Sequence, residues 1–219
     1  MQGSGGTRVS ATDEDGFSRI KKSAIRVSSV LIRGSILLPL LLPSGALAET
    51  HTCKIDPART VVQFEIKHFF GKVIGKFHDV RGTLVIDADH LENSTVAATC
   101  PSRTVDTANR TRDSHLRSEL FETDKFPEAT FRSRKVVQTG KDQADVTGDL
   151  TLHGVTRPIV LHVTLLERKQ ADGGEISRWR ATSDGFSRRA FGLIWSRGVE
   201  AVSGIGDEIA LKIECEARE

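Results

Sequence analysis

Apolar and polar residues alternate along several short segments of this chain, a pattern that strands satisfy and helices do not. Ile159, Leu161 and Val163 lie two positions apart, and successive side chains of a strand point to opposite faces, so these three fall on one face. Residues 62–68 alternate in the same way. A surface helix would instead repeat its apolar residues about every three to four positions. The alternation therefore predicts a protein built mainly from β-strands.

Segments of this kind recur at short spacing between residues 62 and 215, and we count roughly eight of them, which is typical of an antiparallel sandwich or barrel. One segment differs, because Thr111–Glu122 has the composition of a short helix that Asn109 or Thr111 would cap. We therefore expect an all-β fold, an antiparallel β-barrel of about eight strands with a short helical excursion.

The start of the chain predicts an export signal. Basic residues up to Arg33 precede the apolar run Ile36–Leu42, which is too short to span ~30 Å of bilayer hydrocarbon. The Ala-Leu-Ala sequence that ends at Ala48 is the small-x-small pattern that signal peptidase accepts. We therefore assign residues 1–48 to a signal peptide and residues 49–219 to one folded domain. No later stretch is apolar enough to predict a transmembrane segment.

Charge and motif content exclude several functional classes. Lys and Arg total 31 against 29 Asp and Glu, which lacks the basic excess of a nucleic-acid binder. The seven histidines show neither H-x-H nor H-E-x-x-H spacing, so we expect no metal site and no cofactor. Asp113 and His115 form an Asp-x-His pair, but no serine or cysteine nucleophile with a recognisable elbow accompanies it. We therefore expect that the protein is not an enzyme.

The interior of such a barrel is either filled by side chains or holds one ligand. The candidate interior positions are Val62, Phe64, Ile66, Phe77, Leu84, Ile86, Phe131, Ile159 and Leu161. Because they are aliphatic and aromatic, a hollow barrel would suit a long apolar chain, with each buried methylene contributing ~0.8 kcal/mol. The pattern leaves two alternatives open, a hollow barrel that binds a lipid and a filled barrel that serves as a structural or interaction module.

An ordered set of motifs covers nearly the whole predicted mature chain, from about Thr52 to Ala217. The motifs are Ile55-Asp56-Pro57, Val62-x-Phe64-x-Ile66-x-His68-Phe69, Gly75-x-Phe77, Gly82-x-Leu84, Asn109-x-x-Arg112-Asp113-x-His115-Leu116-Arg117-Ser118, Phe126-Pro127, Gly148-Asp149-Leu150-Thr151-Leu152-His153-Gly154-Val155-Thr156, Phe191-Gly192-Leu193-x-Trp195 and Gly206-Asp207-Glu208-Ile209. Together, in this order and spacing, they resemble the YceI family. The chain departs from the family pattern at residues 59–60, where it has Arg-Thr in place of His-Ser. It departs again at residues 187–192, where it has Ser-Arg-Arg-Ala-Phe-Gly in place of Asn-Arg-x-Asp-Phe-Gly.

The resemblance implies a lipocalin-like antiparallel barrel that is exported to the periplasm. It also implies that an elongated central cavity binds a polyisoprenoid or a similar long-chain amphiphilic lipid, including a fatty-acyl lipid, and that the chain forms a homodimer. The protein would then be a lipid carrier or scavenger. An enzyme that acts on a lipid held in the same barrel is the alternative from another functional class.

The motif match also nominates residues for the lipid headgroup. They are Arg112 and His115, with Asn109 and Asp113 positioning them, and Arg189 as a further candidate. An arginine presents a planar fork of donors that suits a phosphate or a carboxylate. Arg112 and Asp113 could equally tie the helical excursion to the barrel wall, so a structural role is the alternative.

Two of the three cysteines are candidates for a disulfide. Cys53 shares strand parity with Ile55, and Cys215 shares it with Ile213, so both should point inward. The first and last strands of a closed up-and-down barrel are neighbours, and export would place the pair in an oxidising compartment. These features favour a Cys53–Cys215 disulfide, and the alternative is three unpaired, buried thiols.

Export can be tested by the position of the N-terminus. In a Gram-negative host we expect the protein in the periplasmic fraction with its N-terminus at or close to Glu49, because the signal peptidase pattern ends at Ala48. N-terminal sequencing of the fractionated protein measures this. Recovery of full-length protein from the cytoplasm, with no processed form, would contradict the signal peptide.

Overall fold

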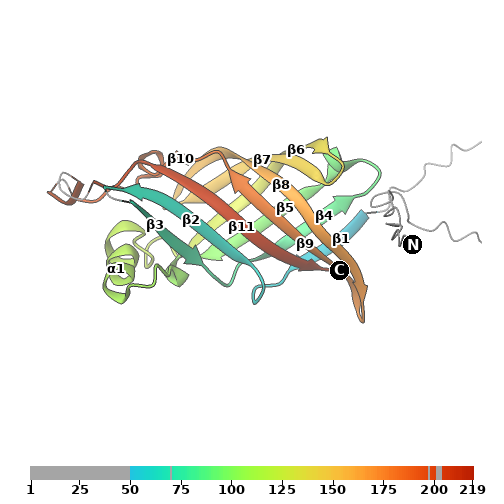
Figure 1. The fold of residues 1–219 in the computed structure, drawn as a ribbon, viewed down its shortest axis with the longest axis horizontal. Helices are drawn as coiled ribbons and strands as arrows, with labels where there is room; N and C mark the ends of the chain where they lie inside the picture. The colour runs from blue at the N-terminus through green and yellow to red at the C-terminus, as the bar shows by residue number, and fades with distance from the viewer. Residues whose placement is uncertain (1–49, 70, 197, 201–203) are drawn as a thin grey trace, which may run out of the picture. The chain divides into compact units, whose positions relative to one another are not determined.

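The computed structural model describes residues 50–69, 71–196, 198–200 and 204–219, and the predicted signal peptide lies outside them. Its strands form one antiparallel 11-stranded sheet (Figure 1). The strands are β1 (Thr50–Ile55), β2 (Val61–His68), β3 (Gly71–Phe77), β4 (Arg81–Asp87), β5 (Thr95–Pro101), β6 (Glu128–Gly140), β7 (Gln143–Leu152), β8 (Val155–Ala171), β9 (Gly174–Ser183), β10 (Phe186–Ser187) and β11 (Glu208–Arg218). The helical elements are η1 (Leu91–Asn93), η2 (Ser102–Thr104), α1 (Arg110–His115), η3 (Leu116–Leu120) and η4 (Arg189–Phe191).

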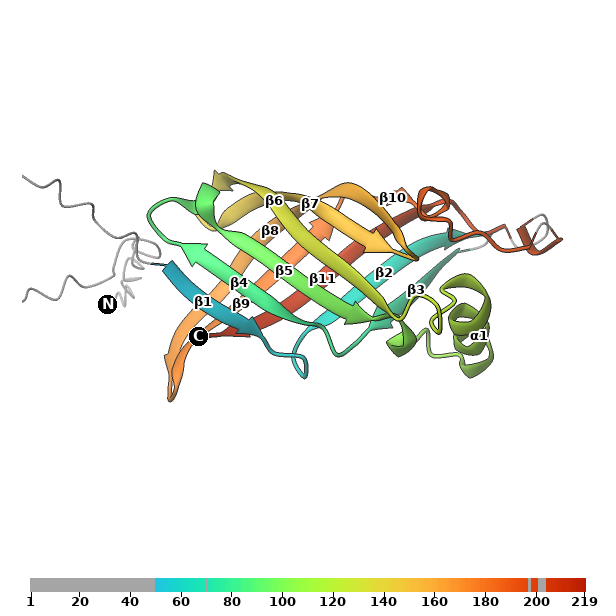
Figure 2. The same cartoon turned by 180° about the vertical axis from the view of Figure 1, so that it is seen from behind.

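Eight of these strands close into a barrel. Neighbouring strands follow the order β1-β4-β5-β6-β7-β8-β9-β11, and β1 pairs with β11 to complete the circle. The strands run obliquely around a shared interior (Figures 1 and 2). The expected all-β antiparallel barrel is therefore confirmed, because the alternating segments turn their apolar faces to one common interior.

Strand β11 closes the wall in two parts. Near its end it pairs with β1, with Ala217 opposite Ile55, whereas residues 209–214 pair with β2. Strand β2 leads into β3, whose outer edge is bridged from Lys76 to Asp106 in the segment before α1. Where β11 pairs with β2, the wall is thus extended by a two-stranded ribbon, β2–β3. This ribbon lies beside the helical turns (Figure 2).

The helical excursion expected at Thr111–Glu122 is present as α1 followed by η3, a single π-helical turn. Asn109 caps α1, since its Oδ1 accepts a hydrogen bond from the backbone N–H of Arg112 at 3.0 Å. Leu116 and Leu120 turn inward and join the apolar cluster at this end of the barrel. Burial of these leucines holds the short helix in place, because a helix of this length is marginal by itself.

The predicted Cys53–Cys215 disulfide is wrong, since both cysteines are free thiols. Strands β1 and β11 are neighbours as expected, but Lys54 stands opposite Arg218, so Cys53 stands opposite position 219, four residues from Cys215. Four residues of strand span roughly 13 Å, whereas a disulfide needs Cα atoms within about 7 Å. Both side chains do join the same apolar cluster. The inward orientation of both cysteines was therefore predicted correctly from strand parity. The register between β1 and β11 could not be predicted from parity.

Candidate ligand-binding cavity

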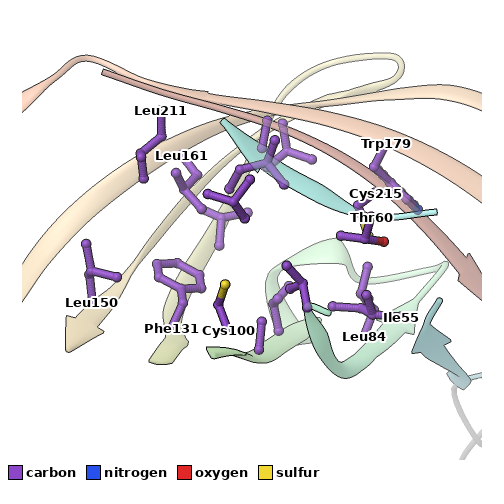
Figure 3. Close-up of a pocket in the computed structure, with 18 of the residues that line it drawn as sticks. Ile55, Thr60, Leu84, Cys100, Phe131, Leu150, Leu161, Trp179, Leu211 and Cys215 are labelled. Carbon is purple, nitrogen blue, oxygen red and sulfur yellow. The ribbon is translucent and has the colours of Figure 1, made fainter. Parts of the chain in front are cut away.

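The barrel encloses an apolar cavity of about 230 Å³. Inward-facing positions of the barrel strands form its wall, and Figure 3 shows Leu84, Phe131 and Leu161 pointing into the same space. Among the described residues that line it, none is charged, and the polar ones are four threonines, one serine, two cysteines and Trp179. A space of this composition suits an apolar guest and offers no ionic partner.

Two thiols in the cavity wall show how dry this space is. Burial raises the pKa of Cys100 to about 12 and the pKa of Cys215 to about 11, because low-dielectric surroundings disfavour the thiolate. Both thiols therefore stay protonated at neutral pH and behave as small hydrophobic groups.

A second cavity, of about 170 Å³, adjoins the first at the helical end of the barrel. Phe77, Leu152, Phe186 and Leu211 line both cavities. A single layer of apolar side chains thus lies between the two spaces. The Phe77 ring is itself packed against Phe64, with ring centroids 5.5 Å apart.

The wall of the second cavity, unlike that of the first, includes cationic side chains. Arg112 from α1 and Arg188 from the turn before η4 line it, together with His68 at the end of β2. Along β2, Phe64 is buried, Ile66 is half-buried and His68 is exposed. This gradient indicates that the second cavity opens toward solvent near the tip of the β2–β3 ribbon, and we call that opening the mouth.

All nine apolar positions expected in the barrel interior lie on the walls of these two cavities. The first cavity is lined by Val62, Phe77, Leu84, Ile86, Phe131, Ile159 and Leu161, and the second by Phe64, Ile66 and again Phe77. Strand alternation therefore predicted correctly which side chains line a cavity. Contact of these side chains with a ligand stays a prediction.

Of the five predicted headgroup residues, Arg112 is placed at a cavity wall. Its Nε donates to Thr107 Oγ1 and its Nη2 donates to the Thr107 carbonyl, both at 2.8 Å. Neither bond uses Nη1. Asp113 is buried and accepts a hydrogen bond from the Thr107 backbone N–H at 2.9 Å. Thr107 therefore braces Arg112 and Asp113 as one unit, and Arg112 also lines the second cavity.

The other three candidates are placed differently. Asn109 serves as the cap of α1. His115 is exposed on the surface of α1. It is not among the described residues that line either cavity. The Arg189 side chain is 53% exposed and its Nη2 donates to Glu200 Oε2 at 2.9 Å. The structure thus brings Asn109 against the Arg112 backbone as a cap, while His115 and Arg189 are not among the described residues that line the second cavity. A binding role for all three stays a prediction.

Two further features concern the part of the chain that the structure describes. No group of three or more His, Cys, Asp and Glu side chains in that part could hold a metal ion. None of its helices is long and apolar enough to cross a membrane.

Comparison with known proteins identifies the family. The family model of the YceI-like domain matches residues 53–217 of this chain. The chain belongs to the YceI family. Protein YceI of Salmonella arizonae is 38% identical to it over 136 residues, which cover 61% of this chain and 71% of that protein.

Solved structures of similar proteins show the same fold. The crystal structure of the Campylobacter jejuni YceI protein matches with a TM-score of 0.61 at 29% identity, covering 70% of this chain and 89% of that one. A polyisoprenoid-binding domain from Saccharophagus degradans, implicated in plant cell wall breakdown, matches with a TM-score of 0.56 at 17% identity and covers 76% of this chain and 97% of its own. At 17% identity the second likeness concerns the fold alone.

Arg188 is a charged cavity residue that the sequence did not nominate. Its side chain is only 1% exposed, and its Nη1 and Nη2 donate to the two carboxylate oxygens of Glu200 at 2.8 and 2.9 Å. It also donates to the backbone carbonyls of Leu193 and Gly206. A signal for it existed, because Arg188 occupies the arginine position of the YceI pattern at residues 187–192, whereas Arg189 occupies the variable position that follows.

Glu200 holds several groups of the mouth together. Besides Arg188, it accepts hydrogen bonds from the backbone N–H of Trp195 at 3.0 Å and from Arg189 Nη2 at 2.9 Å. The hydrogen bonds from Arg188 are the main cause that lowers the pKa of Glu200 to about 2. Glu200 is therefore ionised at neutral pH and neutralises the buried guanidinium beside the second cavity.

Removing the charge of Glu200 should destabilise the fold in a pH-dependent way. Glu200→Gln leaves Arg188 buried without an anionic partner, and breaking a buried pair costs ~3–5 kcal/mol. Since folding lowers the pKa of Glu200 from 4.5 to about 2, its contribution is present above pH 4.5 and is lost as the pH falls toward 2. Urea denaturation should show the largest difference in unfolding free energy at neutral pH and a shrinking difference between pH 4.5 and 2.

Glu119→Gln is the matched control, because Glu119 is exposed on η3. We expect this substitution to change the free energy of unfolding by less than about 0.5 kcal/mol at any pH. A Glu200→Gln effect that matched this control, or that did not vary with pH, would contradict the anchoring role.

Proposed function

We propose that this protein binds a long-chain lipid, of polyisoprenoid or fatty-acyl type, inside its barrel and acts as a carrier or scavenger. The observation that carries the proposal is the first cavity, of about 230 Å³. None of the described residues that line it is charged. An apolar chain gains ~0.8 kcal/mol for each methylene that it buries in such a space. The proposed ligand class agrees with the name of the polyisoprenoid-binding domain of S. degradans, whose likeness to this chain concerns the fold alone.

The two cavities offer an elongated path for such a chain. They are divided by Phe77, Leu152, Phe186 and Leu211, and side chains of these types can change rotamer without any change of the backbone. A tail that filled the first cavity and displaced this layer would continue into the second. Its polar end would then lie near the mouth, beside His68 and Arg112.

Arg112 is the cation best placed for an anionic headgroup. Arg188 is already neutralised by Glu200, whereas the two hydrogen bonds of Arg112 to Thr107 leave its Nη1 unused. A charge-assisted hydrogen bond to a phosphate or carboxylate contributes ~1.5–3 kcal/mol. We therefore assign the headgroup end of the lipid to Arg112.

Binding accounts for this cavity better than catalysis does. Covalent catalysis by a cavity thiol would need an activated thiolate, but the raised pKa values of Cys100 and Cys215, about 12 and about 11, keep these thiols protonated. A filled structural module fits less well, because the interior contains two cavities. Export to the periplasm completes the proposal, and its support is the sequence of residues 1–48.

Filling the cavity should abolish lipid binding without loss of the fold. Ala144 lines the first cavity from β7, so Ala144→Phe places a ring in the space of the lipid tail. Native mass spectrometry of protein purified without detergent should show a bound lipid on the wild type and little or none on the variant. Circular dichroism should show that both remain folded.

Thr147→Phe is the matched control, because Thr147 lies on the same strand at a position of opposite parity and points away from the cavity. We expect it to retain the lipid. If wild-type protein never carries a lipid, or if both variants lose it equally, the carrier proposal fails.

Arg112→Ala should discriminate between lipids by their headgroup. Loss of a charge-assisted hydrogen bond predicts a Kd for an anionic lipid that is roughly ten- to a hundredfold higher, with no change for a neutral lipid of equal chain length. Arg110→Ala serves as control, since Arg110 is exposed on the same helix. Fluorescence titration with the two lipids measures this. Equal weakening for both lipids would instead make Arg112 a structural clasp.

A further inference from the structure

Large apolar side chains gather on the outer surface around the mouth. Six such side chains are exposed in the part of the chain that the structure describes, and four of them belong to the β2–β3 ribbon or to the segment after η4. These four are Phe69, Ile74, Ile194 and Val199, which are 62%, 43%, 53% and 38% exposed, and we call them the mouth surface. The ribbon and this segment project together from one end of the barrel (Figures 1 and 2). Apolar groups clustered on a surface mark an interaction site.

Direct contacts join the two segments that carry the mouth surface. The backbone N–H of Gly206 donates to the carbonyl of Lys67 at 2.9 Å. The Phe69 ring lies against the bare backbone of Gly204, where a Cβ atom would come within 2.2 Å of the ring. Arg188 adds a hydrogen bond to the Gly206 carbonyl at 2.9 Å. The exposed apolar groups therefore stand on one braced platform.

The mouth surface also adjoins the opening of the second cavity. Phe69 follows His68, and Ile194 precedes Trp195, and both of these neighbours line the cavity. A lipid that leaves the cavity at the mouth would emerge beside the exposed apolar side chains.

The β2–β3 ribbon, which carries Phe69 and Ile74, has a net positive charge. The β2–β3 ribbon carries Lys67, Lys72 and Lys76, all exposed, against one acidic residue, Glu65. Lys72 is paired with Glu65 at 2.9 Å, so the ribbon keeps a net positive charge. Exposed aromatic and aliphatic groups together with lysines are the composition of surfaces that insert into the headgroup region of a membrane, where lysine binds anionic lipids.

We propose that the mouth surface docks onto a lipid bilayer that contains anionic headgroups, so that the ligand passes between the bilayer and the cavity without entering water. This inference rests on the proposed lipid-binding function. A second copy of the chain suits the surface less well, because a two-fold contact would set the lysines of one ribbon against those of the other. The lysines favour an anionic bilayer over a neutral one, since their attraction to the surface is electrostatic.

The test is flotation of the purified protein with large unilamellar vesicles. We expect binding to vesicles of phosphatidylethanolamine and phosphatidylglycerol, weaker binding to vesicles of phosphatidylcholine alone, and a loss of binding as salt is added. The double variant Phe69→Ser/Ile194→Ser should lower the partition coefficient on the anionic vesicles at least about tenfold. A second variant, Lys67→Gln/Lys76→Gln, should reduce binding to the anionic vesicles and remove the preference for them.

Val137→Ser/Leu166→Ser is the matched control, because these two side chains are 41% and 43% exposed and belong to β6 and β8 rather than to the mouth surface. We expect it to float like the wild type. Failure of the wild type to bind anionic vesicles, or equal loss in both double serine variants, would overturn the docking proposal. So would the finding that the mouth variants change self-association in sedimentation velocity but not flotation, since the occupant would then be a second copy.

Native mass spectrometry of the same samples separates this proposal from the lipid-binding function. Bound lipid on a protein that does not float refutes docking alone. Flotation of a protein that never carries a lipid refutes the carrier function and leaves the membrane contact standing. Should Phe69→Ser/Ile194→Ser misfold, the lysine variant and the salt dependence still decide the outcome.

Discussion

The shared pairing of strand β11 is the constraint on which the rest of the structure depends. Its last residues close the barrel against β1, while residues 209–214 pair with β2 instead, and its other edge pairs with β9. One strand thus closes a cavity at one end and supports a separate ribbon at the other. Without that division, no β2–β3 ribbon would extend from the barrel. Helix α1 and the mouth of the second cavity would then lack the strands beside them.

The two ends of the interior consequently differ in chemistry. The first cavity lies within the closed wall, where desolvation keeps the thiols of Cys100 and Cys215 protonated and where burial favours only apolar groups. The second lies under the ribbon and α1, where two arginines can reach its wall. Arg188 is compatible with burial because Glu200 neutralises it, and Arg112 because Thr107 accepts two of its hydrogen bonds. An amphiphilic ligand, with an apolar tail and a polar end, matches this polarity.

The contacts of the mouth connect ligand binding with the outer surface. Glu200 joins Arg188 to the backbone of Trp195, and Arg188 in turn holds Gly206, which is bonded to the end of β2. The same few side chains therefore shape the second cavity from within and hold the exposed apolar groups in place outside. A change at Glu200 would act on both.

The sequence by itself determined the fold class, the apolar lining and the family, because strand alternation is local and the motifs recur in order. Val62, Leu84 and Phe131 could be placed in the interior from parity alone, and Asn109 and Thr111 could be named as the two candidate helix caps. Tertiary structure decided what parity leaves open. The register of β1 against β11 separated Cys53 from Cys215, and the packing of η4 chose Arg188, not Arg189, for the cavity wall. The four exposed apolar side chains of the mouth were also invisible in the sequence, since their exposure depends on which neighbours leave them uncovered. Periodicity fixes the face on which a side chain lies, whereas long-range pairing fixes what that face meets.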